Sequence, residues 1–204
     1  MSDSGVGITF RETMKGGFAL GETDPAAGEK RGKAEGMVLT MNASIEIPDM
    51  RAFLADGRHG GKISGEVAFP PLGENIPARS GVFQLFSPTE NAATKAMVYE
   101  LLLDSRGTSY YLAGRKEVRD DPGLDLWTDT TTLFTRLHKG SDKTAPVAGA
   151  GILTLGLDDL ARLVSTVRVT GAKSLEETAM VVGDFGRFFL GKLWDSYVSK
   201  NKTP

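Results

Sequence analysis

The stretch most suited to chemistry covers residues 124–133, where a tryptophan and a carboxylate precede three consecutive threonines. Asp129 could present its carboxylate, beside threonine hydroxyls, to a cavity in which Trp127 forms an apolar wall. The structural alternative is simpler: Asp129 caps a turn through its side chain, and Trp127 packs at the rim of the fold. Both residues are kept as candidates for ligand binding.

A second candidate is Lys116, because side chains in residues 110–118 alternate between two faces and Lys116 falls on the more apolar one. If that face points inward, Lys116 is a buried cation that needs a partner, and Asp129 or Glu100 could supply it. A solvated strand end is the simpler interpretation. The candidate ligand-binding residues are Trp127, Asp129, Tyr99, Lys116 and Tyr111.

Other catalytic and metal chemistries receive little support. The chain has no cysteine, which excludes disulfides, thiolate metal sites and cysteine nucleophiles. The two histidines, His59 and His138, have the neighbours of exposed turns, and no Gly-x-Ser-x-Gly elbow accompanies them. The adjacent acidic pairs at 120–121 and 158–159 lack the spacing of a calcium loop. We expect no metal site and no cofactor, and we assign no catalytic residue.

Length and composition limit the class of protein. The 204 residues contain 24 Lys plus Arg against 26 Asp plus Glu, so the net charge of -2 gives no basic footprint for nucleic acid. No run approaches the roughly 20 apolar residues of a transmembrane helix, and the first residues do not resemble a secretory signal. We therefore expect a cytoplasmic protein.

Alternating apolar residues predict that a sheet carries the candidate residues. The clearest strand covers 37–47, and further strands are expected over 7–20, 62–69, 81–86, 96–103, 108–118, 130–137 and 149–155. In the clearest strand one face consists of Met37, Leu39, Met41, Ala43, Ile45 and Ile47. Residues 104–107 predict a tight hairpin, whereas residues 21–36 are expected to be a polar loop.

Two helices are expected after the strands. Residues 158–166 carry an apolar stripe, and a second helix begins at Ser174, where Glu177 completes a capping box, and runs toward Lys200.

Sequential strands with short connections predict a mainly β fold, an antiparallel up-and-down meander or lipocalin-like barrel of about eight strands with a long C-terminal helix. We expect a single domain over 1–204, with the β-meander at 8–155 and the helical part at 158–200. An open sheet around the C-terminal helix is the alternative. A closed barrel of this size either fills its interior with side chains or holds one small ligand.

Several motifs together resemble a bacterial accessory module. They are TFRETMKG at 9–16, IEI at 45–47, PLG at 71–73, GRK at 114–116, LWTDTTTL at 126–133, GAGIL at 149–153 and FGRFFLGKLW at 185–194. The module occurs beside cholesterol-oxidase-like flavoproteins of the glucose-methanol-choline type, in chains that can also carry an α/β-hydrolase domain. The resemblance covers about residues 8–198 and implies a lipid or sterol context. Because the flavin-binding Gly-x-Gly-x-x-Gly is absent, it implies no flavin chemistry.

Three functions are compatible with these observations. The first is a binding module for an apolar small molecule, such as a sterol or lipid, that is accessory to a partner oxidoreductase or hydrolase. The second is a small isomerase or cyclase that uses Asp129 with a polar partner as acid and base. The third is a scaffold domain that docks a partner enzyme through an apolar face of the C-terminal helix.

Overall fold

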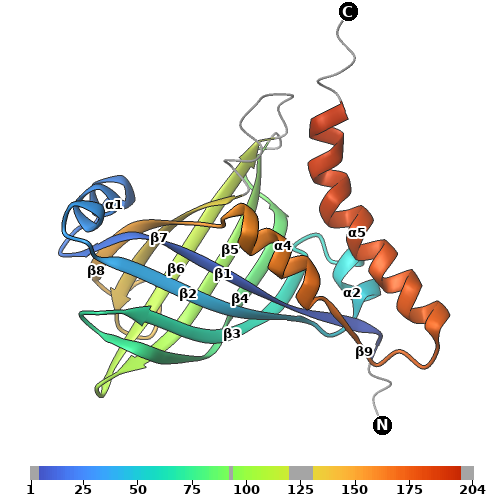
Figure 1. Ribbon diagram of the computed structural model, residues 1–204, viewed down its shortest axis with the longest axis horizontal. Helices are drawn as coiled ribbons and strands as arrows, with labels where there is room; N and C mark the ends of the chain where they lie inside the picture. The colour runs from blue at the N-terminus through green and yellow to red at the C-terminus, as the bar shows by residue number, and fades with distance from the viewer. Residues whose placement is uncertain (1–4, 92–93, 120–130, 199–204) are drawn as a thin grey trace, which may run out of the picture.

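The computed structural model is a closed antiparallel barrel of eight strands with helices packed around it (Figure 1). It describes residues 5–91, 94–119 and 131–198, without the side chains of Ser80, Arg119, Leu157, Leu160, Ala161 and residues 190–198. The strands are β1 (Gly7–Leu20), β2 (Val38–Ile47), β3 (Gly60–Phe69), β4 (Gly73–Pro88), β5 (Thr94–Ser105), β6 (Thr108–Arg119), β7 (Thr132–Lys139), β8 (Val147–Thr154) and the short β9 (Arg168–Thr170).

The barrel closes because β1 is used on both edges. Each strand from β2 to β8 pairs with its neighbour in sequence, β8 pairs with β1, and β1 pairs with β2. The predicted mainly β barrel is therefore confirmed. In β2 the predicted apolar face is the inner one, since Leu39, Met41, Ala43, Ile45 and Ile47 are all buried in the core. Buried side chains line the interior, with Phe18, Phe69 and Phe83 among the largest.

The predicted hairpin between β5 and β6 is confirmed. Ser105 pairs with Thr108, which leaves a two-residue turn. The turn residues Arg106 and Gly107 have φ values of 51° and 76°. Two successive left-handed residues are what a type I′ turn requires, and this turn suits the twist of the adjoining strands.

Residues 21–36 do not form the predicted polar loop, because they contain helix α1 (Pro25–Ala34). Asp24 caps this helix by accepting a hydrogen bond from the backbone N–H of Ala27 at 2.9 Å. Pro25 occupies the first turn, where its missing N–H has no intrahelical partner to lose. Both signals lie in the sequence, whereas the glycines and the polar composition of the segment favour a loop.

The glycines of α1 belong to the face that packs on the barrel. A Cβ atom at Gly28 would overlap the carbonyl oxygen of Ala150 in β8, and one at Gly32 would overlap the backbone of Phe18 in β1. Each glycine lowers intrinsic helix stability by about 1 kcal/mol relative to alanine. Close packing against the two strands offsets this penalty, and it depends on residues far away in the sequence.

One edge of β1 is covered in three sections. Residues 15–20 pair with β8, and residues 7–9 pair with β9. Between these sections helix α4 (Leu157–Thr166) lies against β1, and the Arg11 backbone N–H donates to Thr166 Oγ1 at 2.9 Å. The Thr166 side chain thus satisfies a backbone group that has no strand partner on this edge of β1.

Helices α2 (Met50–Ala55) and α5 (Leu175–Val198) lie together at one end of the barrel, away from α1 (Figure 1). The serine half of the predicted capping box at the start of α5 is confirmed, since Ser174 Oγ accepts from the Glu177 N–H at 3.1 Å. The Glu177 carboxylate accepts from the Lys173 N–H, one residue before the cap, at 2.6 Å. Among the described residues, no helix has the length and apolar character needed to cross a membrane.

Candidate functional site

A glutamate, a tyrosine and a lysine lie close together inside the barrel: Glu12 from β1, Tyr99 from β5 and Lys116 from β6. Their exposed fractions are 4%, 3% and 1%. Each falls on the inward-facing parity of its strand, so the same alternation that buries the neighbouring apolar residues also buries these three. We call them the inner cluster.

The two oxygens of the Glu12 carboxylate serve different partners. The Tyr99 hydroxyl donates to Oε2 at 3.0 Å, and Lys116 Nζ lies 3.8 Å from Oε1. Lys116 Nζ also lies 5.0 Å from the centroid of the Tyr99 ring, within the range of a cation–π interaction. The three groups therefore form one connected polar unit in a largely apolar interior.

Burial dominates the electrostatics of the inner cluster. Loss of hydration lowers the pKa of Lys116, and the charge of Glu12 opposes part of this shift. Burial also raises the pKa of Tyr99 well above 10.0, and the Glu12 carboxylate raises it further. The Tyr99 phenol thus remains a hydrogen-bond donor at neutral pH, whereas the Lys116 amine loses its proton more readily than an exposed lysine does.

A row of aromatic rings connects the inner cluster with helix α5. Tyr99 packs edge-on against Phe83 at 5.2 Å between ring centroids, and Phe83 contacts Phe10 at 6.2 Å. Phe10 lies 5.5 Å from Phe185 of α5, which stacks on Phe189 at 5.7 Å. An apolar path of side chains therefore leads from the helix-covered end of the barrel to the three polar groups.

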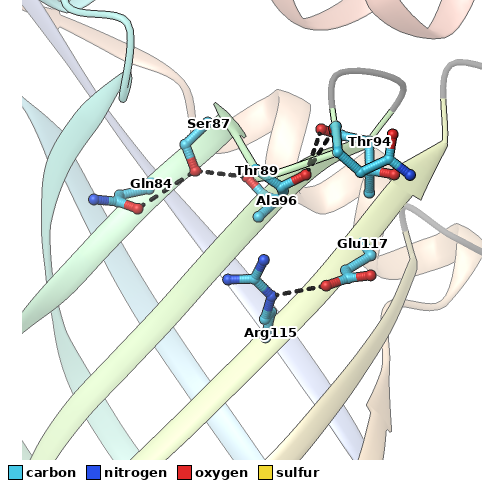
Figure 2. A network of polar contacts seen from close by, with 8 residues as sticks. Gln84, Ser87, Thr89, Thr94, Ala96, Arg115 and Glu117 are labelled. Carbon is cyan, nitrogen blue, oxygen red and sulfur yellow. Dashed lines mark hydrogen bonds and ion pairs between the residues drawn. The ribbon is translucent and has the colours of Figure 1, made fainter.

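An irregularity in β4 contributes another ring to this end. The pairing of β4 with β5 shifts between Gln84 and Ser87, and Phe86 has a φ of 53°. The shift places Phe86 against the rings of α5. Ser87 stabilises the bulge, since its hydroxyl donates to the Ala96 carbonyl oxygen at 3.1 Å (Figure 2).

Helix α5 rests on this end of the barrel mainly through phenylalanine rings. Phe188 lies 5.3 Å from Phe53 of α2, 4.6 Å from His59 and 5.9 Å from Phe86 between centroids. Asp49 supports the short helix α2 as its N-cap, accepting from the Ala52 N–H at 2.9 Å. The contact with α5 is thus built from aromatic rings on α2, β4 and the loop before β3.

The outer face of the barrel wall carries a second set of the same residue types. The Tyr111 hydroxyl donates to Glu100 Oε2 at 2.6 Å, and Lys143 Nζ lies 3.3 Å from Glu100 Oε1. We call these three residues the outer cluster. Glu100 and Lys143 border a surface groove of about 420 Å³, in which Val82 and Phe134 are 41% and 47% exposed.

The structure brings together only part of the predicted site. Tyr99 and Lys116 belong to the inner cluster, whereas Tyr111 lies on the opposite face of the wall. Trp127 and Asp129 lie outside the described residues, so their predicted roles remain predictions.

The interpretation of Lys116 as a solvated strand end is wrong, since the side chain is buried. Glu100, one of its two suggested partners, faces outward, and the carboxylate that pairs with Lys116 is Glu12. A signal for Glu12 existed in the sequence, because it shares the parity of Ile8, Phe10 and Met14.

The histidines and acidic residues do not build a metal centre in the described part of the chain, where no group of three or more His, Asp or Glu side chains could hold an ion. His138 is not in the exposed turn that its neighbours suggest. It lies within β7, is buried, and its Nδ1 lies 2.7 Å from the Ala145 carbonyl oxygen.

Comparison with known proteins identifies no relative of this chain. The chain matches no protein-family model, no curated protein and no solved structure. The inner cluster is the most distinctive chemical feature of the barrel interior.

Proposed function

We propose that the barrel binds one apolar small molecule, such as a sterol or a fatty acyl compound, and that the inner cluster holds the polar end of this ligand. The observation that carries the proposal is the placement of three polar groups at the end of an aromatic path inside an apolar barrel. Ligand sites commonly combine apolar walls with a few polar groups that orient the ligand.

The cost of burial also supports a functional role. Removing an ion pair from water has a desolvation penalty that its mutual attraction often fails to offset, and an apolar replacement of similar volume is often as stable or more so. Stability alone therefore gives little reason to retain Glu12 and Lys116 in the interior. In a binding site, Tyr99 and Lys116 can donate to a ligand oxygen, and Glu12 can accept from a ligand hydroxyl.

The ligand would enter the barrel at the end that helix α5 covers. The rings of Phe185, Phe188 and Phe189 occupy the end of the barrel that leads to the inner cluster, so an apolar ligand competes with these rings. Methionines in the interior, among them Met14, Met41 and Met97, adapt to a new neighbour at low energetic cost because their side chains are unbranched.

The biological role we propose is that of an accessory module. Its resemblance to modules beside cholesterol-oxidase-like flavoproteins and α/β-hydrolase domains suggests that it presents an apolar substrate to such a partner enzyme, or stores the product. A second candidate function is an isomerase acting on the same ligand. The contact between the Glu12 carboxylate and two proton donors favours it, because a buried acid–base set can move a proton within a bound substrate.

The test is a binding titration of the purified chain with a fluorescent sterol that retains its hydroxyl group, with native mass spectrometry for the stoichiometry. We expect saturable one-to-one binding that an unlabelled sterol displaces. Tyr99→Phe should weaken binding about fivefold, as expected for one hydrogen bond of about 1 kcal/mol. Tyr111→Phe removes the equivalent phenol from the outer cluster and should leave binding unchanged.

Two further variants locate the ligand. Phe185→Ala removes a ring that competes with the ligand and should increase affinity, whereas Phe134→Ser makes the outer groove polar and should have no effect. Absence of saturable binding would refute the proposal. Binding that Phe134→Ser abolishes and Tyr99→Phe leaves intact would place the ligand on the outer face, and would refute it equally. The isomerase candidate requires turnover that Glu12→Gln abolishes.

A further inference from the structure

We propose that Lys116 forms a reversible imine with an apolar aldehyde or ketone inside the barrel, with Glu12 as the counter-charge and proton carrier. This inference rests on the proposed function, because the carbonyl compound must first bind in the interior. It narrows the ligand class from apolar molecules in general to those that carry a reactive carbonyl group at the polar end.

The position of the amine is the first argument. Lys116 Nζ belongs to a side chain that is 1% exposed, and it lies in an interior lined by apolar groups. Water competes with imine formation, since it returns the imine to amine and carbonyl. An amine that is shielded from bulk water therefore retains an imine longer than a surface lysine does.

The neighbours of the amine supply the second argument. Glu12 Oε1 lies 3.8 Å from Nζ, and the Tyr99 hydroxyl holds the other carboxylate oxygen at 3.0 Å. A carboxylate fixed in this way stabilises a protonated imine, whose charge resides where the ammonium charge was. Burial also lowers the pKa of Lys116, which increases the fraction of neutral, nucleophilic amine.

The reaction balances without any further reagent. Lys116 transfers one proton to Glu12, and the neutral nitrogen attacks the carbonyl carbon to form a carbon–nitrogen bond. The carbonyl oxygen takes up the second proton of the nitrogen and then the proton that Glu12 carries. It leaves as water while the carbon–nitrogen double bond forms. The product is a protonated imine, so the net charge is unchanged, and nothing is oxidised or reduced.

The outer cluster provides an internal control for this chemistry. Lys143 lies 3.3 Å from Glu100, and Tyr111 donates to the same carboxylate, yet the Lys143 side chain is 67% exposed. The two lysines have the same types of neighbour, and they differ in burial. If burial governs imine formation, the two sites should react very differently with the same carbonyl compound.

The experiment uses the full chain, decanal as the probe, and sodium cyanoborohydride to reduce any imine to a stable amine. Decanol, which cannot form an imine, reports non-covalent binding by native mass spectrometry and competition. At equimolar decanal we expect one adduct per chain, heavier by one decanal less one oxygen atom. Peptide mapping should place it on Lys116 with at least tenfold preference over Lys143, and decanol should suppress it.

Glu12→Gln should reduce the trapped fraction at Lys116 at least tenfold while decanol binding persists. The wild-type peptide map decides the question even if this variant folds poorly. Saturable decanol binding without a preferred adduct on Lys116 would overturn the imine and leave the proposed binding function standing. An adduct distributed equally over Lys116 and Lys143 would overturn it too. If neither decanol nor decanal binds, the binding function fails, and the imine fails with it.

Discussion

The buried ion pair of the inner cluster allows a quantitative prediction about folding stability. Lys116→Met replaces the cation by an apolar side chain of similar length and leaves the Glu12 carboxylate in the interior without this ammonium group. At 3.8 Å and an effective dielectric constant of about 20, the attraction between the two charges is about 4 kcal/mol. Breaking one side of a buried ion pair typically costs about 3–5 kcal/mol. We therefore expect the free energy of unfolding to fall by about 3–4 kcal/mol.

Removing both charges should be less harmful than removing one. In the double variant Glu12→Gln with Lys116→Met, neither charge remains, and the glutamine carbonyl can still accept from the Tyr99 hydroxyl. We expect the double variant to be more stable than Lys116→Met alone by at least about 1.5 kcal/mol, because the uncompensated charge is gone. The interaction energy from the double-mutant cycle should lie at about 2–4 kcal/mol.

The assay is equilibrium unfolding in urea at neutral pH, followed by far-ultraviolet circular dichroism, for the wild type, both single variants and the double variant. Lys143→Met and Glu100→Gln form the matched cycle on the outer face, where Lys143 is exposed and the pair should contribute less than about 1 kcal/mol. Additive effects of the two inner substitutions would refute the reasoning, because they would show that the charges of Glu12 and Lys116 do not interact in the folded protein.

Three further predictions follow from other parts of the structure. Burial keeps the folded-state pKa of Tyr99 above 10.0, so the unfolded chain loses this proton first and stability falls as the pH rises above that value. In Tyr99→Phe the decline should be shallower by about 1.4 kcal/mol per pH unit, measured by urea unfolding on either side of this pH. Gly32→Ala places a Cβ against the backbone of Phe18 and should lower the melting temperature and increase hydrogen exchange in α1; unchanged exchange would contradict the packing described. Asp49→Ala removes the cap of α2 and should cost about 1 kcal/mol in urea unfolding, whereas Asp49→Asn should cost less.

The elements of this protein could largely be predicted from local patterns. Period-two alternation located the strands and separated the inner from the outer face, and it placed Lys116 on the apolar side of β6. The hairpin at Arg106 and Gly107 and the Ser174 cap of α5 could also be predicted, because a turn or a cap depends on a few adjacent residues. Helix α1 was missed because its glycines are favourable only against the backbone of β1 and β8.

The site was harder to predict than the elements, because alternation indicates which face a side chain occupies but not which residues it contacts there. Glu12 and Tyr99 are 87 residues apart in the sequence, and their contact depends on how the closed sheet brings the inner faces of β1 and β5 together. The sequence by itself determined that Lys116 would need a buried partner if its face pointed inward. Only the tertiary structure decided that the face does point inward and that the partner is Glu12, since barrel closure and strand register are set by pairings across the whole chain.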